Sequence, residues 1–172
     1  PTDRQEALQS HLMLFFTGAS RMSSEVAADV VNNLVSKRDR LRRMRALVDE
    51  ALAILASTRS LDEIGHLLHE TWQLKRGLGN SVSNAFIDDI YECARSHGAL
   101  GGKLLGAGGA GFMALYVPPE RQAEVRSALH GCLHVPFRFE HEGSVLVQYQ
   151  PDDLNPTLTR IRSALPALAY AS

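Results

Sequence analysis

The chain has 172 residues, of which 45% are hydrophobic and 22% are charged, a composition typical of a globular protein with a buried core. Eighteen basic residues nearly balance nineteen acidic ones, so no overall charge would recruit nucleic acid or an anionic membrane surface. No apolar stretch approaches the length of a membrane span, and two cysteines are too few for a disulfide framework. We therefore expect a cytoplasmic protein with neither nucleic-acid nor membrane partners.

The first half of the chain is expected to be mainly helical. His11–Gly18 is a short apolar run closed by Thr-Gly, which predicts a buried strand. A helix is then expected from about Ser24 to Ser57, with one break near Ser36. The apolar residues there recur at helical spacing and predict a buried stripe: Val26, Val30, Leu34, Leu41, Val48, Leu52 and Leu55.

Two further helices are expected before the second half begins. Ser60 precedes acidic residues and predicts the start of a helix that runs to about Lys75. The sequence GLGNS then interrupts the pattern, and either Ser83 or Asn84 can cap a helix that ends near His97.

In the second half of the chain, the spacing of the apolar residues changes to that of strands. Lys103–Leu105 and Phe112–Val117 are expected strands, and Pro118 opens a helix to about His130. VPFRFE and SVLVQY alternate apolar and polar residues around Glu142-Gly143, which predicts an antiparallel hairpin. The fold class is therefore α+β, with the helical half packed on a mostly antiparallel, four-stranded, ferredoxin-like sheet. We expect one domain over residues 1–151 and a tail over 152–172.

The sequence LLGAGGAGF places four glycines within six positions, with the spacing G-x-G-x-x-G at Gly106, Gly108 and Gly111. A dinucleotide site needs such a loop between a strand and a helix, whereas FMALYV after Gly111 predicts a strand, so NAD is disfavoured. A plain turn needs fewer glycines, because each one adds backbone entropy that folding must overcome. A loop whose backbone amides face a phosphate remains the favoured interpretation, and a plain turn the alternative.

Several motifs resemble one enzyme family. GGKLLGAGGAGF is similar to the third motif of the GHMP kinases, which lies in their C-terminal domain. Other segments resemble the C-terminal half of the D-glycero-D-manno-heptose 7-phosphate kinases, in the family order: LFFTGASR, WQLKRGLGNSVSN, IDDIYECAR and VPFRFEHEGSVLVQYQP. The resemblance covers about Leu12 to Pro151.

This resemblance implies an ATP- and Mg²⁺-dependent phosphorylation of the anomeric hydroxyl of a sugar phosphate. GLGNSVS looks like the family's ATP-binding second motif, but it lies only about two dozen residues before the third motif, so we reject that match. The nucleotide site and the catalytic base are then expected in an N-terminal kinase domain that precedes this chain. The chain starts at Pro1 and reaches an expected strand within a dozen residues, as a fragment would. We expect no kinase activity from it alone.

The resemblance assigns the phosphate and substrate loop to Gly106, Ala107, Gly108, Gly109, Ala110 and Gly111. Many relatives have Gly where this chain has Ala110, so that position cannot require a left-handed backbone. Four basic residues are candidates for the substrate phosphate: Arg21, Lys75, Arg76 and Lys103. The alternatives are a surface arginine for Arg21, a helix end stabilised by cations for Lys75 and Arg76, and a solvent-facing side chain for Lys103.

Other patterns are assigned ordinary roles. KRDRLRRMR keeps the apolar stripe and predicts a solvated helix face. His66 and His69 lack the spacing of a zinc site, and Cys132 is expected to be a buried thiol, so no metal site is predicted. A homo-oligomer is left open. The rival function is a non-catalytic domain of ferredoxin-like topology that binds a small anion or regulates a partner.

Overall fold

The computed structural model describes residues 2–18, 23–33, 35–140 and 142–144. By its internal contacts the chain divides into a unit of residues 1–138 and a second unit of residues 139–172, and each is described by itself. The predicted boundary between a domain at 1–151 and a tail at 152–172 lies outside the described residues and stays a prediction.

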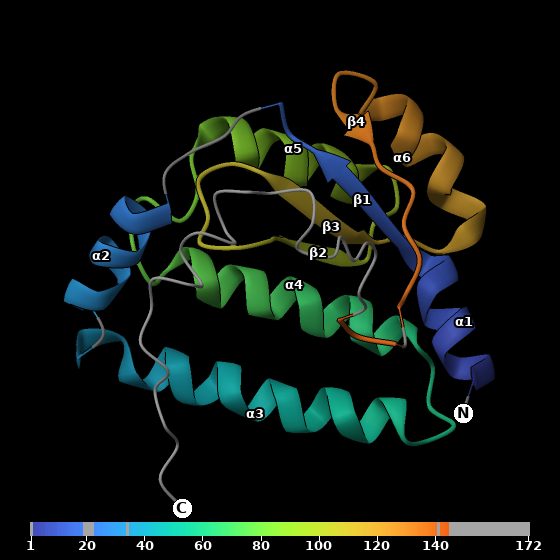
Figure 1. Ribbon diagram of the computed structural model, residues 1–172, viewed down its shortest axis with the longest axis horizontal. Coiled ribbons are helices and arrows are strands. Elements are labelled where there is room, and N and C mark those ends of the chain that lie inside the picture. Colours follow the sequence, from blue (N-terminus) through green and yellow to red (C-terminus); the bar gives the residue numbers. More distant parts are fainter. Residues whose placement is uncertain (1, 19–22, 34, 141, 145–172) are drawn as a thin grey trace, which may run out of the picture. The chain divides into compact units, whose positions relative to one another are not determined.

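A four-stranded antiparallel sheet forms the centre of the first unit (Figure 1). The strands are β1 (Leu12–Phe16), β2 (Gly101–Leu104), β3 (Phe112–Tyr116) and β4 (Leu133–His134). Their spatial order is β2-β3-β1-β4, and every neighbouring pair is antiparallel. This is the order of a ferredoxin-like sheet, so the α+β class expected from the sequence is confirmed.

In the described part of the chain, helices lie before β1, between β1 and β2, and between β3 and β4. They are α1 (Thr2–His11), α2 (Ser23–Asn33), α3 (Arg38–Leu55), α4 (Asp62–Arg76), α5 (Ala85–Ser96) and α6 (Gln122–Ala128), with short 3₁₀ turns at Val35–Lys37 and Pro119–Arg121. The break expected near Ser36 is the first of these turns. The helix α1 was not predicted, since its sequence TDRQEALQSH has no apolar face and buries no residue.

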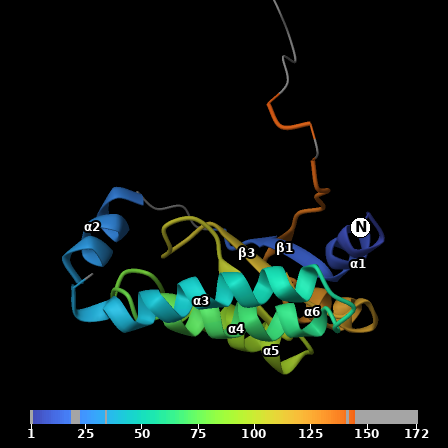
Figure 2. The same cartoon turned by 90° about the horizontal axis from the view of Figure 1, so that it is seen from below.

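Helices α4 and α5 cover one face of the sheet (Figures 1 and 2). The core between them holds Phe15 of β1, Met113 and Leu115 of β3, and the aromatic side chains Trp72 and Tyr91 of the two helices. Helix α4 lies so close to β2 that a Cβ added to Gly101 would overlap the carbonyl oxygen of Gly65. This contact places the last turn of α4 beside the end of β2.

The predicted apolar stripe of α3 is partly wrong. Leu47 and Ile54 are the buried residues of that helix, whereas Val48 and Leu52 are 53% and 60% exposed. The reason is that α3 packs chiefly on α4, so only a narrow strip of its surface is covered (Figure 1). Apolar spacing alone does not show how wide the covered strip is.

The predicted hairpin around Glu142-Gly143 is not formed by the described residues. In the first unit, Val135 still donates its N–H to the carbonyl of Leu14 at 2.8 Å, but the strand β4 ends at His134. Residues 135–140 form no helix or strand. The second limb, SVLVQY, lies outside the described residues apart from its first serine.

Candidate functional site

The glycine loop occupies residues 105–111, between the antiparallel neighbours β2 and β3. Gly106, Gly108, Gly109 and Gly111 all have positive φ, and no other residue type does in the described part of the chain. Ala107 and Ala110 therefore have negative φ, which agrees with the expectation for Ala110. Positive φ is a conformation that residues with a Cβ rarely adopt, so the path of this loop depends on its glycines.

Gly108 is required by close packing as well as by its φ of +124°. A Cβ at this position would meet the carbonyl oxygen of Val82 at 2.5 Å. The same carbonyl accepts the N–H of Gly109 at 2.9 Å. The GLGNSVS segment is thus the surface on which the glycine loop lies.

Four amides of the loop have no acceptor within the described residues. The N–H groups of Leu105, Gly109 and Gly111 are bonded to Phe112, Val82 and Thr17. The N–H groups that have no such partner are those of Gly106, Ala107, Gly108 and Ala110. Backbone amides are strong donors that ordinarily find a partner, so these four are available to a ligand or to water.

Lys75 lies beside the first residues of the loop. Its ammonium donates to the carbonyl of Leu104 at 3.0 Å and to that of Gly106 at 2.7 Å. Burial, together with the positive charge of Lys103, lowers the pKa of Lys75 to about 8. A lysine ammonium has three donors, so one remains for an anion.

The other basic candidates are placed differently. Arg76 donates to the carboxylate of Asp88 at 2.9 Å, which uses one of its five N–H donors. Lys103 is half-buried in the middle of β2 and lies close enough to Lys75 to influence its pKa. Arg21 lies outside the described residues. The structure therefore brings Lys75 and Lys103 together beside the loop, with Arg76 adjoining Lys75 in sequence.

Sequence reasoning missed two residues that hold the loop. Thr17, expected only to end a strand, donates its N–H and its hydroxyl to the carbonyl of Gly111, both at 2.9 Å. Asn84 caps α5 by accepting the N–H of Ile87 at 3.0 Å, as one of two predicted caps. Its amide group also donates to the carbonyl of Gly109 at 2.8 Å. Both contacts join segments far apart in the chain, and no local pattern predicts them.

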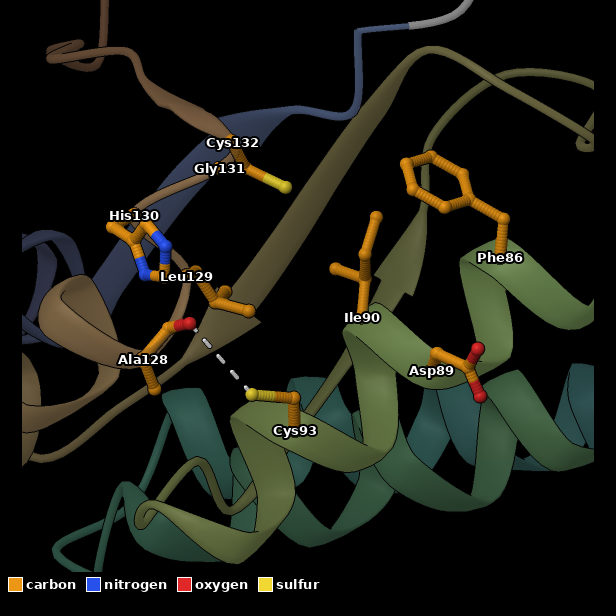
Figure 3. A pocket seen from close by; sticks show the side chains of 9 residues that line it. All are labelled: Phe86, Asp89, Ile90, Cys93, Ala128, Leu129, His130, Gly131 and Cys132. Atoms are coloured by element: carbon orange, nitrogen blue, oxygen red, sulfur yellow. Dashed lines mark hydrogen bonds between the residues drawn. The ribbon is translucent and has the colours of Figure 1, made fainter.

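A cavity of about 300 Å³ lies between α5 and the turn after α6 (Figure 3). Its walls include Phe86 and Ile90 and the free thiols Cys93 and Cys132. Burial raises the pKa of Cys132, and this residue packs against the core as a half-buried thiol. The lining contains no residue of the glycine loop and none of the four basic candidates, so the cavity is separate from the predicted site.

The basic run of α3 is partly neutralised by neighbouring carboxylates. Arg43 makes ion pairs with Glu70 and Glu50, whose hydrogen bonds raise the pKa of this guanidinium, and Arg42 pairs with Asp39. Among the described residues there is no group of three acidic, histidine or cysteine side chains arranged to hold a metal ion. No helix of the described segments has the length and apolar character needed to cross a membrane.

Comparison with known proteins gives one family. The family model described as "GHMP kinases C terminal" matches residues 44–134 of this chain. The bifunctional fucokinase/GDP-fucose pyrophosphorylase of Arabidopsis thaliana is 33% identical over 130 residues, which are 71% of this chain and 12% of that protein. The D-glycero-alpha-D-manno-heptose 7-phosphate kinase of Campylobacter jejuni is 27% identical over 124 residues, 71% of this chain and 36% of that protein. The chain thus spans well under half of these relatives.

The fold is shared with solved structures. The crystal structure of the Methanococcus jannaschii mevalonate kinase matches with a TM-score of 0.64 at 21% identity. The match covers 77% of this chain and 41% of that one. At this identity the likeness shows the fold and not the substrate.

Proposed function

Because the chain belongs to the GHMP kinases through their C-terminal domain, we propose that it forms the substrate-binding part of an ATP-dependent sugar-phosphate kinase. The substrate that we propose is a heptose 7-phosphate, phosphorylated on its anomeric hydroxyl. The similarity to the Campylobacter jejuni heptose kinase over 71% of the chain supports this choice, as do the motifs from LFFTGASR onward.

The observation that carries the proposal is the glycine loop with four amides that have no acceptor among the described residues. Enzymes transfer a phosphoryl group chiefly by positioning the reactants and neutralising the charge that develops on the phosphate oxygens. Fixed backbone amides do both without having to reorganise during the reaction. The ammonium of Lys75 adds a positive charge beside the first residues of the same loop, and one of its three donors remains for the phosphate.

ATP and Mg²⁺ are the proposed cofactors. The loop amides and Lys75 suit phosphate oxygens, whereas a divalent cation needs oxygen ligands such as carboxylates. The described residues offer no cluster of such ligands, so we assign the metal and the nucleotide to an N-terminal kinase domain outside this chain. Lys75 and Lys103 are the proposed contacts of the substrate phosphate, and Arg76 and Arg21 remain proposed contributors.

The test is to combine this chain with a separately expressed N-terminal half of the same protein. We expect ATP- and Mg²⁺-dependent phosphorylation of heptose 7-phosphate by the complex, seen as a new anomeric phosphate by ³¹P NMR, and no transfer by either part alone. The variant Gly108→Val should abolish transfer, because its side chain has no room against Val82. Gly131→Ala, at an open position, is the matched control.

Other outcomes would correct the proposal in defined ways. Preferred transfer to fucose or to mevalonate, the substrates that the names of similar proteins indicate, would leave the kinase assignment and replace the substrate. A folded complex that binds ATP and transfers phosphate to none of the three would favour the regulatory, anion-binding function instead.

A further inference from the structure

The carbonyl oxygens of the glycine loop are held by three donors from different parts of the fold. Gly106 accepts from the ammonium of Lys75 at 2.7 Å, and Gly109 accepts from the side-chain amide of Asn84 at 2.8 Å. Gly111 accepts from both the N–H and the hydroxyl of Thr17. These donors come from the last turn of α4, the cap of α5 and the end of β1, which meet around the loop between β2 and β3 (Figure 1).

Holding these carbonyls has an electrostatic consequence. A carbonyl oxygen carries a partial negative charge that repels a phosphate, whereas an N–H group attracts it. Three carbonyls are occupied by protein donors, while four amides of the same loop have no acceptor among the described residues. The carbonyls of Leu105, Ala107, Gly108 and Ala110 have no donor among the described residues either, so the bonds create no surplus of donors. They direct three of the seven loop carbonyls toward protein donors instead of toward a ligand, and they fix the backbone that carries the four amides.

Thr17 is the most informative of the three donors. Its exposed fraction is 3%, and it is the only buried polar residue that the described core contains. A buried hydroxyl destabilises a protein unless it is hydrogen-bonded. Among the described residues, the partner of the Thr17 hydroxyl is Gly111, whose carbonyl accepts from it at 2.9 Å and whose N–H donates to it at 3.3 Å. Within the part of the chain that the structure describes, this hydroxyl therefore bonds to the glycine loop alone.

We propose that Thr17, together with Asn84 and Lys75, is a positioning residue that fixes the loop carbonyls so that the free amides bind phosphate. The inference rests on the proposed function, because it assumes that the loop receives a phosphate group. Thr17 itself does not touch the ligand. Its effect on binding passes entirely through the position of Gly111.

The experiment measures binding of inorganic phosphate to the ¹⁵N-labelled chain at constant ionic strength. In the wild type, the amide signals of Gly106, Ala107, Gly108 and Ala110 should shift in a saturable way. Thr17→Val keeps the shape of the side chain and removes the hydroxyl, so the dissociation constant should rise about fivefold or more. Thr17→Ser restores the hydroxyl and should bind within about twofold of the wild type.

Two further variants separate positioning from general destabilisation. Thr71→Val makes the same change on α4, away from the loop, and should leave phosphate binding unchanged. Asn84→Ser keeps an oxygen to cap α5 but loses the amide donor to Gly109, and it should weaken binding while the helix persists. This second variant decides the question if Thr17→Val does not fold.

The outcomes distinguish this inference from the proposed function. If the wild-type chain shows no saturable phosphate binding, the phosphate role of the loop fails and the positioning role fails with it. If the wild type binds and both Thr17→Val and Asn84→Ser bind equally well, only the positioning role is overturned. Loss of binding in Thr17→Val that serine does not restore also contradicts it.

Discussion

At the level of single residues, two glycines of the loop are needed for different physical reasons. Gly106 and Gly108 both have positive φ, which a residue with a Cβ adopts at a penalty. A Cβ on Gly106 meets no atom within 4 Å, whereas one on Gly108 meets the backbone of Val82. The first glycine is needed for its conformation alone, and the second for its conformation and for space.

The two positions therefore predict different stabilities. Gly106→Ala should lower the free energy of unfolding by about 1 kcal/mol, from backbone strain alone. Gly108→Ala should lower it by about 2 kcal/mol or more, because the segment at Val82 must also move. Gly131→Ala, at an open position without positive φ, should stay within about 0.5 kcal/mol. Urea denaturation measures all three, and equal losses for Gly106→Ala and Gly108→Ala would contradict the close packing.

Lys75 predicts a pH dependence of stability. Its pKa in the folded chain is about 8, below the ordinary value of 10.5. Below pH 8 both folded and unfolded chains hold the proton, and between about pH 8 and 10.5 only the unfolded chain does. Because the unfolded state then binds more protons, this residue makes the free energy of unfolding rise with pH across that window.

The measurement compares wild type with Lys75→Met by denaturation from pH 7 to pH 10. The wild-type free energy of unfolding should climb relative to that of the variant as the pH passes 8. In Lys103→Met the climb should start at a higher pH, since removal of the neighbouring charge raises the pKa of Lys75. Parallel curves for wild type and Lys75→Met would show that this lysine titrates normally.

At the scale of elements, α3 shows how packing selects among apolar residues. Its sequence offers an apolar stripe, and the fold buries Leu47 and Ile54 but leaves Val48 and Leu52 exposed. The difference arises because α3 packs chiefly against α4. Apolar residues toward the edge of such a contact contribute little to the core.

This arrangement predicts unequal losses on truncation of two leucines. Leu47→Ala should lower the free energy of unfolding by about 2 kcal/mol or more, as is usual for a buried leucine. Leu52→Ala should change it by about 0.5 kcal/mol or less, because that side chain is 60% exposed. Thermal and urea unfolding of the pair provide the check. A larger loss at Leu52 would mean that this face of α3 is covered in solution.

At the scale of the first unit as a whole, the packing of α4 on β2 positions Lys75. Gly65 and Gly101 let the helix approach the strand closely, and this approach brings Lys75 to the carbonyls of Leu104 and Gly106. The candidate site thus depends on a contact at Gly65, almost three helical turns away along α4.

A substitution at that contact should therefore act on the site. Gly101→Ala should lower the free energy of unfolding by about 1–3 kcal/mol through overpacking. It should also shift the pKa of Lys75 upward from about 8, because displacement of α4 exposes the ammonium to water. NMR titration of the lysine side chains measures that shift. An unchanged pKa in a destabilised variant would mean that the loop moves with the helix.

The sequence alone determined much of this protein. The spacing of apolar residues, the helix caps and the helix-breaking residues located β1, the helices α2 to α6 and the strands β2 and β3. These signals act between residues a few positions apart, so they can be read from the sequence. The glycine spacing and the neighbouring motifs indicated the family and the loop. The segment VPFRFE shows a limit of the same reasoning, since its alternation of apolar and polar residues predicted a strand, whereas residues 135–140 form none.

The way in which the candidate site is built follows from the packing of distant segments. The loop is held by Thr17, Lys75 and Asn84, which lie between 25 and 94 positions away from their partners in the chain. The tertiary packing also pairs Arg76 with Asp88 and leaves Val48 and Leu52 exposed. Such contacts depend on which surfaces meet when the sheet and the helices pack. Patterns of neighbouring residues in one sequence do not show which surfaces these are.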